Sequence, residues 1–136
     1  MNILSIAGSE PSSGAGIQND IKTFSSLGVY GLVVITAITS QNTKKFSLVE
    51  KVSTEMIKSQ LRSVLSDFKI DIIKIGMVYS SDVIKTIYFS LQNVKIPIVL
   101  DPVIESTTGG ILLQKEVLYD FKKPNWVDTS FGNRCQ

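Results

Sequence analysis

Residues 3–20, with the sequence ILSIAGSEPSSGAGIQND, decide the fold class. The stretch begins with an apolar run over residues 3–7, which Gly8-Ser9 closes. A segment rich in Pro, Ser and Gly follows, as is typical of a loop after a buried strand. The sequence therefore predicts a strand that ends in a glycine-bearing loop.

A helix is predicted directly after this loop. Three apolar residues recur there at helical spacing, namely Ile17, Ile21 and Phe24. Ser12 or Ser13 is the expected N-cap, and Gly28 is the expected terminator.

Strands and helices continue to alternate along the chain. Three further apolar runs predict strands, at residues 31–39, 70–75 and 96–100. Helical periodicity predicts one helix after Ser53, one that begins at Ser80 or Ser81, and a weaker one over residues 114–121. Four such repeats predict an α/β fold, in which a mostly parallel sheet lies between two helical layers in a three-layer α-β-α arrangement.

Composition excludes several classes of function. The 136 residues are 43% apolar and 19% charged, which is typical of a single globular domain. The net charge of +2 comes from scattered Lys and Arg, so nucleic acid is not an expected partner. Histidine is absent and Cys135 is the single cysteine, which excludes a His base, a Cys-rich zinc site and an internal disulfide in this sequence. Since no basic leader or membrane-spanning apolar stretch is found, a cytoplasmic location and no membrane partner are expected.

Small or polar residues end the predicted strands. Ligands of open parallel sheets bind beyond the carboxyl ends of the strands, so these residues are the candidate site. The candidates are Gly8, Gln41, Met77 and Asp101, with Asp20 from the first predicted helix. A glycine allows close backbone approach, an amide both donates and accepts hydrogen bonds, and a carboxylate can hold magnesium.

Each candidate also has a purely structural explanation. Gly8 fits a plain turn, Gln41 a loop amide and Asp101 an ordinary turn before Pro102. Met77 fits an apolar core, and Asp20 fits a solvated acid near the positive end of a helix. Pattern alone therefore predicts a crevice for a small polar molecule.

Four motifs carry a resemblance to a known family. They are residues 6–20, residues 28–31 leading into residues 34–43, residues 74–77 and residues 101–103. In this order they resemble the hydroxymethylpyrimidine and phosphomethylpyrimidine kinases of thiamine biosynthesis, which belong to the ribokinase-like superfamily. The resemblance extends over about residues 3–113 and agrees with the predicted order of strands and helices.

The resemblance implies a transferase that uses ATP and Mg²⁺. The expected acceptor is 4-amino-5-hydroxymethyl-2-methylpyrimidine and then its monophosphate. The resemblance assigns Gln41 to the aminopyrimidine edge, Asp20 to the neighbourhood of the hydroxymethyl group, and Asp101 to the magnesium and phosphate region. It places Gly8 and Met77 against the ring. A homodimer is compatible with the family. A pyridoxine or pyridoxal kinase, and a non-catalytic pyrimidine-binding domain, are the alternatives.

The sequence departs from the family in several places. Glu10 stands where the family commonly has Asp, and Glu105 stands where a small or apolar residue is usual. The catalytic Gly-x-Gly turn with its Asp or Cys is not found, so no catalytic residue is assigned and turnover is expected to be lost or impaired.

Residues 1–123 are therefore expected to form the N-terminal part of a ribokinase-like kinase domain. Residues 124–136 are expected to be an atypical tail, either the product of a shifted reading frame or a divergent terminus. A native interaction tail that uses Trp126 and Phe131 is the alternative.

Overall fold

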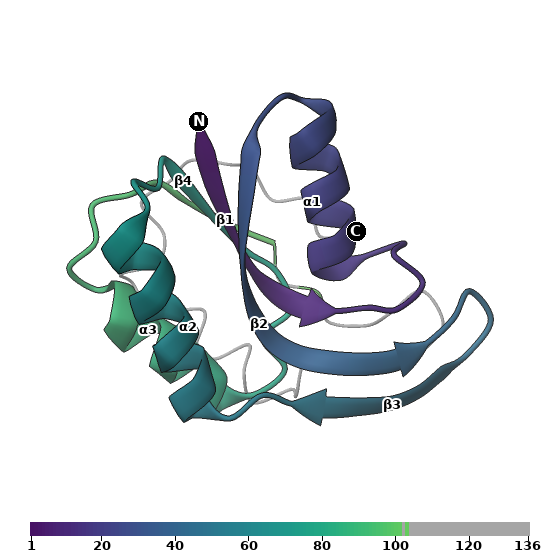
Figure 1. Cartoon of the computed structure of the whole chain (residues 1–136). Coiled ribbons are helices and arrows are strands. Elements are labelled where there is room, and N and C mark those ends of the chain that lie inside the picture. Colours follow the sequence, from purple (N-terminus) through teal and green to yellow (C-terminus); the bar gives the residue numbers. More distant parts are fainter. Residues whose placement is uncertain (102, 104–136) are drawn as a thin grey trace.

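A computed structural model describes residues 1–101 and 103 of the protein (Figure 1). Its helices and strands follow one another in this order: β1 (Asn2–Ser9), α1 (Gly16–Ser26), β2 (Tyr30–Gln41), β3 (Phe46–Lys51), α2 (Thr54–Asp67), β4 (Ile72–Ile75), α3 (Ser81–Leu91) and β5 (Ile98–Leu100).

The described part of the chain forms a five-stranded sheet in the order β3-β2-β1-β4-β5. β1 pairs in parallel with both β2 and β4, and β4 pairs in parallel with β5. β3 is antiparallel to β2. The structure therefore confirms the mostly parallel sheet, and β3 is an addition that the sequence did not predict. Its side chains are half-buried or exposed, as expected of an edge strand, so it lacks the continuous apolar run of the other strands.

Helices cover both faces of this sheet, as predicted. α1 lies on one face, and α2 and α3 lie side by side on the other (Figure 1). Successive side chains of β1 point to opposite faces of the sheet. Leu4 and Ile6 join the core beneath α2 and α3, whereas Ser5 faces α1 and bonds to Asp20. The fold is thus three-layered.

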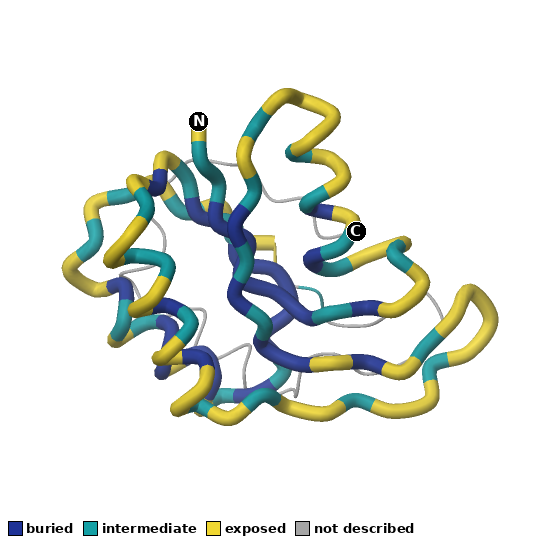
Figure 2. Tube along the Cα trace, viewed as in Figure 1, coloured by how far each residue is buried: buried dark blue, intermediate teal, exposed yellow. Residues whose placement is uncertain are grey.

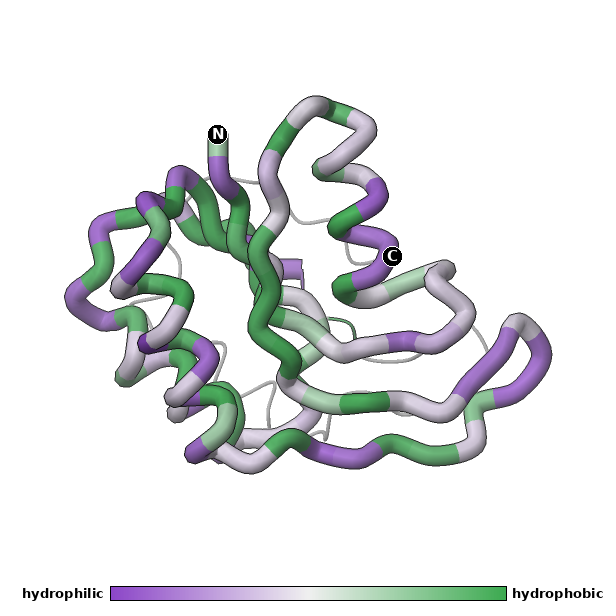
Figure 3. Tube along the Cα trace, viewed as in Figure 1, coloured by the Kyte–Doolittle hydropathy of each residue, from purple (hydrophilic) through white to green (hydrophobic). Residues whose placement is uncertain are grey.

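The main core lies between the sheet and the α2–α3 layer. Figure 2 shows that burial concentrates in the central strands, and Figure 3 shows that the turn between β2 and β3 is hydrophilic. The buried members of this core are Leu4, Ile6, Leu32, Val34, Ile57, Leu61, Ile70, Ile73, Ile75, Val78, Val83, Ile84, Ile87 and Leu91. Burial of a residue of this kind contributes roughly 1.5–3 kcal/mol, so this layer dominates the stability of the fold.

Two of the three predicted helix starts are confirmed. Ser53 caps α2 by accepting a hydrogen bond from the Met56 N–H, and Ser80 is the N-cap of α3. The prediction for α1 was wrong, because its N-cap is Ala15 rather than Ser12 or Ser13. The backbone before Ala15 bends around the Glu10 carboxylate, which delays the start of the helix.

Several predictions fall outside the described residues. They concern the helix over residues 114–121, the departure from the family at Glu105, and the boundary at residue 124 with its tail. Within the described residues, no helix combines the length and apolar character that crossing a membrane requires.

Candidate functional site

A cavity opens at the carboxyl ends of the parallel strands, where the sequence places the candidate site. It is about 60 Å³ in volume, several times the roughly 10–15 Å³ that one water molecule needs. Its lining residues are Ala7, Gly8, Ser9, Glu10, Ala15, Gly16, Thr39, Gln41, Lys74, Gly76, Met77 and Val103. The cavity thus brings together Gly8, Gln41 and Met77, three of the predicted site residues.

Close backbone packing shapes the floor of the cavity. A side chain at Gly8 would place its Cβ 2.8 Å from the Met77 sulfur, so glycine leaves the thioether room to lie across this strand. Gly16 has a φ of +61°, and its Cβ would lie 2.3 Å from the Gly8 carbonyl oxygen. Only glycine fits there without moving the chain. Met77 also packs with Ala37 and with partly buried residues that include Phe46 of β3.

Gln41 supplies an unsatisfied polar atom. Its Oε1 is buried and has no hydrogen-bond partner among the described residues. A buried acceptor without a partner costs about 1–3 kcal/mol, so native proteins rarely keep one without a ligand or water to satisfy it. Nearby polar side chains are already engaged, because Thr39 donates to the Ser9 carbonyl and the Ser9 hydroxyl accepts from Gln18. The amide of Gln41 is therefore suited to a ligand with a donor at its edge.

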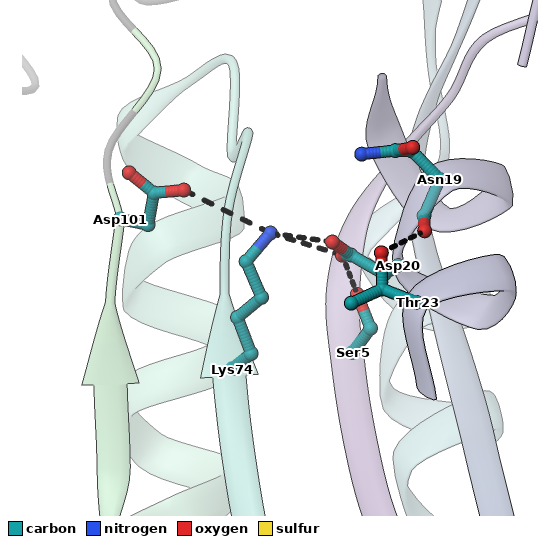
Figure 4. Close-up of polar contacts among 6 residues, drawn as sticks. All are labelled: Ser5, Asn19, Asp20, Thr23, Lys74 and Asp101. Atoms are coloured by element: carbon teal, nitrogen blue, oxygen red, sulfur yellow. Dashed lines mark hydrogen bonds and ion pairs between the residues drawn. The ribbon is translucent and has the colours of Figure 1, made fainter. Parts of the chain in front are cut away.

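A polar network lies on the α1 side of the sheet, beside the cavity (Figure 4). Lys74 Nζ donates to Asp20 Oδ1 at 2.8 Å and to Oδ2 at 3.0 Å, and the Ser5 hydroxyl donates to Oδ2 at 2.6 Å. Asp101 Oδ2 lies 3.8 Å from the same ammonium. Lys74 thus stands between two acids from different parts of the chain, and it lines the cavity while they do not.

Glu10 organises the loop on the other side of the cavity. Its buried carboxylate accepts hydrogen bonds from the backbone N–H groups of Ser12, Gly14 and Ala15. Burial alone would raise the pKa of Glu10, but hydrogen bonding to the Ser12 side chain and to these three backbone N–H groups outweighs burial and holds the pKa below the ordinary value. The Glu10 N–H in turn donates to Gln18 Oε1. The ionised Glu10 side chain therefore fixes the conformation of the loop over residues 10–15, which contributes to the lining of the cavity.

Asp101 is the residue that the resemblance assigns to magnesium. Its side chain is 63% exposed and lies across from Lys74. The described residues contain no cluster of three or more His, Cys, Asp or Glu that would form an all-protein metal cage. Mg²⁺ is commonly held by one or two carboxylates together with substrate phosphates and water, so Asp101 fits as a single ligand of that kind.

The five predicted residues thus occupy two adjoining places. Gly8, Gln41 and Met77 line the cavity, whereas Asp20 and Asp101 meet at Lys74 beside it. Sequence reasoning did not single out Ser5, Lys74 or the role of Glu10. Lys74 is a cation between Ile73 and Ile75 of a predicted buried strand, which is a signal that could have found it, whereas Ser5 carries no signal of its own.

The site as a whole is suited to a small, flat and polar molecule. Gly8 and Met77 offer an apolar surface for a ring, while Gln41 and Lys74 offer polar contacts at its edges. This agrees with a crevice at the strand ends of an α/β sheet.

Comparison with known proteins identifies the family. The family model described as phosphomethylpyrimidine kinase matches residues 10–125. The hydroxymethylpyrimidine/phosphomethylpyrimidine kinase of Rhizobium meliloti (strain 1021) is 48% identical over 115 residues, which are 85% of this chain and 43% of that protein. The chain therefore spans less than half the length of this relative.

Solved structures agree with the fold. The phosphomethylpyrimidine kinase of Clostridium difficile 630 superposes with a TM-score of 0.81 at 45% identity, over 89% of this chain and 53% of that one. The pyridoxal kinase of Staphylococcus aureus, in complex with AMP-PCP and pyridoxal, gives a TM-score of 0.67 at 36% identity, over 75% of this chain and 38% of that one. Since the family model covers most of the sequence, the chain belongs to the phosphomethylpyrimidine kinase family.

Proposed function

We propose that this chain forms the pyrimidine-binding part of a kinase that phosphorylates 4-amino-5-hydroxymethyl-2-methylpyrimidine and its monophosphate in thiamine biosynthesis. The observation that carries the proposal is the buried Oε1 of Gln41 at the cavity, which has no hydrogen-bond partner in the part of the chain that the structure describes. An aminopyrimidine presents an amine donor next to a ring nitrogen acceptor. The amide of Gln41 can accept from the first and donate to the second.

The remaining walls support the same ligand. Gly8 lets the ring approach the backbone of β1, and Met77 supplies a polarisable apolar surface. Asp20 and Asp101 both contact Lys74, which lines the cavity, and this supports a role for them near a substituent on the ring. The names of the relatives support the substrate class, since they are hydroxymethylpyrimidine/phosphomethylpyrimidine kinases.

ATP is the proposed phosphoryl donor of the whole protein, with Mg²⁺ as its counterion and Asp101 as a ligand of that ion. Bound Mg²⁺ would neutralise charge on the transferring phosphoryl group. Support for a nucleotide comes from neighbouring kinases that were solved with AMP-PCP or ADP. Because the chain spans 43% of the Rhizobium relative, transfer is proposed for the whole protein and pyrimidine binding for this chain.

The direct test is titration calorimetry of the purified chain with the hydroxymethyl pyrimidine, without nucleotide. We expect a measurable heat of binding and a loss of at least tenfold in affinity for Gln41→Ala, since about 1.4 kcal/mol corresponds to tenfold. Gln92→Ala is the matched control, because Gln92 is exposed at the end of α3. No binding by the unaltered chain, or equal binding by Gln41→Ala, contradicts the proposal.

A pyridoxal kinase is the second candidate, because the Staphylococcus aureus enzyme shares the fold at 36% identity. Competition between the hydroxymethyl pyrimidine and pyridoxal for the same chain separates the two. The Gln41 amide predicts a preference for the aminopyrimidine, since pyridoxal has no ring amine. An assay for ATP-dependent phosphorylation then distinguishes a kinase from a binding domain without turnover.

A further inference from the structure

No residue has yet been assigned to the polar contact that a bound ligand would make in the cavity besides the one with Gln41. Besides Gln41, the polar side chains in the lining are those of Ser9, Glu10, Thr39 and Lys74. Each of the first three already makes a hydrogen bond within the described residues: the Ser9 hydroxyl accepts from Gln18, Thr39 donates to the Ser9 carbonyl, and the Glu10 carboxylate accepts from three backbone N–H groups.

Lys74 retains a donor for a ligand. An ammonium group has three N–H donors, and in the described residues Lys74 Nζ hydrogen-bonds only to the two oxygens of Asp20. The Asp101 oxygen, at 3.8 Å, is beyond hydrogen-bond distance. Gly76 leaves space beside the ammonium, because a Cβ added at this glycine would be in van der Waals contact with Nζ at 3.6 Å.

Lys74 and Gln41 line the same cavity from two different strands. β2, which carries Gln41, and β4, which carries Lys74, pair with the two different edges of β1. β1 therefore lies between these two strands, and its Gly8 lines the cavity as well. A ring that is held at Gln41 by its aminopyrimidine edge and rests on Gly8 extends toward β4.

Asp20 contacts the Lys74 ammonium from outside the lining of the cavity. Its carboxylate already accepts from Ser5 and twice from Lys74, and it does not line the cavity. Its side chain is 11% exposed, against 24% for that of Lys74. These contacts give Asp20 the part of a support that fixes the direction of the Lys74 side chain.

We propose that Lys74 is a specificity-determining residue of this site, and that its free N–H donates to the oxygen of the hydroxymethyl group on the bound pyrimidine. Asp20 and Ser5 hold the ammonium in place. This inference rests on the proposed pyrimidine binding, and it assigns to Lys74 the hydroxyl contact that the family resemblance places near Asp20.

The test compares two ligands by calorimetry on the full chain: the hydroxymethyl pyrimidine and 4-amino-2,5-dimethylpyrimidine, which lacks the hydroxyl. The unaltered chain is expected to bind the first about tenfold or more tightly than the second, since a hydrogen bond from a charged donor is worth that much. In Lys74→Met this ratio is expected to fall to about twofold or less, while the affinity for the dimethyl ligand, held by Gln41, stays within about threefold. Lys58→Met, at an exposed position of α2, is the matched control and keeps the original ratio.

Two further variants guard against a folding defect. The double variant K74M/D20N removes both charges together, so that no unpaired ion is left, and it is expected to show the same loss of discrimination as Lys74→Met. Asp20→Asn alone keeps the ammonium but weakens its support, so it is expected to lower the ratio less than Lys74→Met does.

The outcomes separate the two proposals. If the unaltered chain binds neither ligand, the pyrimidine-binding function fails and this inference fails with it. If it binds both ligands equally, or if K74M/D20N keeps the tenfold ratio, Lys74 does not contact the hydroxyl although the chain binds pyrimidines. A larger loss of the ratio in Asp20→Asn than in Lys74→Met would assign the contact to Asp20 and overturn the role of Lys74.

Discussion

The two faces of the sheet are built from the same strands but differ in kind. Toward α2 and α3, β1 and β4 present Leu4, Ile6, Ile73 and Ile75, all almost completely buried in one apolar core. Toward α1, the residues between them are polar, and Ser5 and Lys74 meet at Asp20. A strand of period two can thus serve stability on one face and a ligand site on the other.

The difference teaches which substitutions should affect folding and which should affect binding. Apolar burial stabilises the fold without requiring contacts of a fixed direction. Truncating a buried side chain on the α2–α3 face therefore lowers the free energy of unfolding. The polar face depends on paired charges and on hydrogen bonds with fixed geometry, whose net contribution to stability is smaller. The variants below test this contrast, from the largest expected effect on stability to the smallest.

The largest effect is expected from Ile57→Ala on α2. Ile57 is fully buried in the main core, so its truncation should lower the free energy of unfolding by about 2–5 kcal/mol. Urea denaturation followed by circular dichroism measures the loss. Met56→Ala on the same helix is the matched control, since Met56 is 55% exposed and should change stability by about 0.5 kcal/mol or less. Equal losses at the two positions would refute the assignment of the core.

Lys74→Met is expected to cost about 2 kcal/mol, because it leaves the carboxylate of Asp20 without its cation. This value is below that of a fully buried pair, since the Lys74 side chain retains some contact with solvent. In K74M/D20N the loss should shrink to about 1 kcal/mol or less. Additive losses in the same urea experiment would show that the two side chains act independently.

Glu10→Gln is expected to cost about 1 kcal/mol near pH 7 and to change the acid limb of the stability curve. The pKa of Glu10 in the folded chain lies below its ordinary value of 4.5. The unfolded chain therefore takes up a proton first as the pH falls, and the stabilisation present above pH 4.5 is lost as the pH falls through the lowered folded pKa. Unfolding free energies between pH 7 and pH 3 should fall less steeply for the Gln variant. An unchanged slope would contradict the role given to the carboxylate.

The smallest effect is expected at the pair between Lys51 and Asp82, which joins the end of β3 to the start of α3. Lys51 Nζ lies 2.6 Å from Asp82 Oδ2. The hydrogen bond from Lys51, and after it the one from Ser80, lowers the pKa of Asp82. Both side chains are more than one-third exposed, so Lys51→Ala should cost about 0.5 kcal/mol or less. Adding 0.5 M salt should remove most of this difference. A larger, salt-insensitive loss would mean that the pair is part of the structural core.

Much of the fold could be predicted from the sequence, because apolar runs and helical periodicity report burial directly. β3 escaped prediction since an exposed edge strand such as Phe46–Lys51 needs no continuous apolar run. The start of α1 was misplaced because the Glu10 carboxylate captures the backbone donors that a Ser12 or Ser13 cap would have used. Interactions of this kind depend on three-dimensional geometry and leave no periodic pattern.

The site was only partly predictable for a similar reason. Strand ends could be located from the sequence, and with them Gly8, Gln41 and Met77, which do line one cavity. The role of Lys74 depends on Asp20, which is 54 positions away in the sequence. The two residues meet because β4 pairs with β1 and α1 packs against β1. The roles of the predicted residues in binding stay predictions until a ligand is placed.

The most direct test of the pyrimidine site is a crystal structure of the chain with the hydroxymethyl pyrimidine bound. The account predicts that the ring lies on Gly8 against Met77, with its amine within hydrogen-bond distance of Gln41 Oε1, the atom that has no partner among the described residues. A ring bound elsewhere, or bound in this cavity with the Gln41 oxygen still unpartnered, would contradict it.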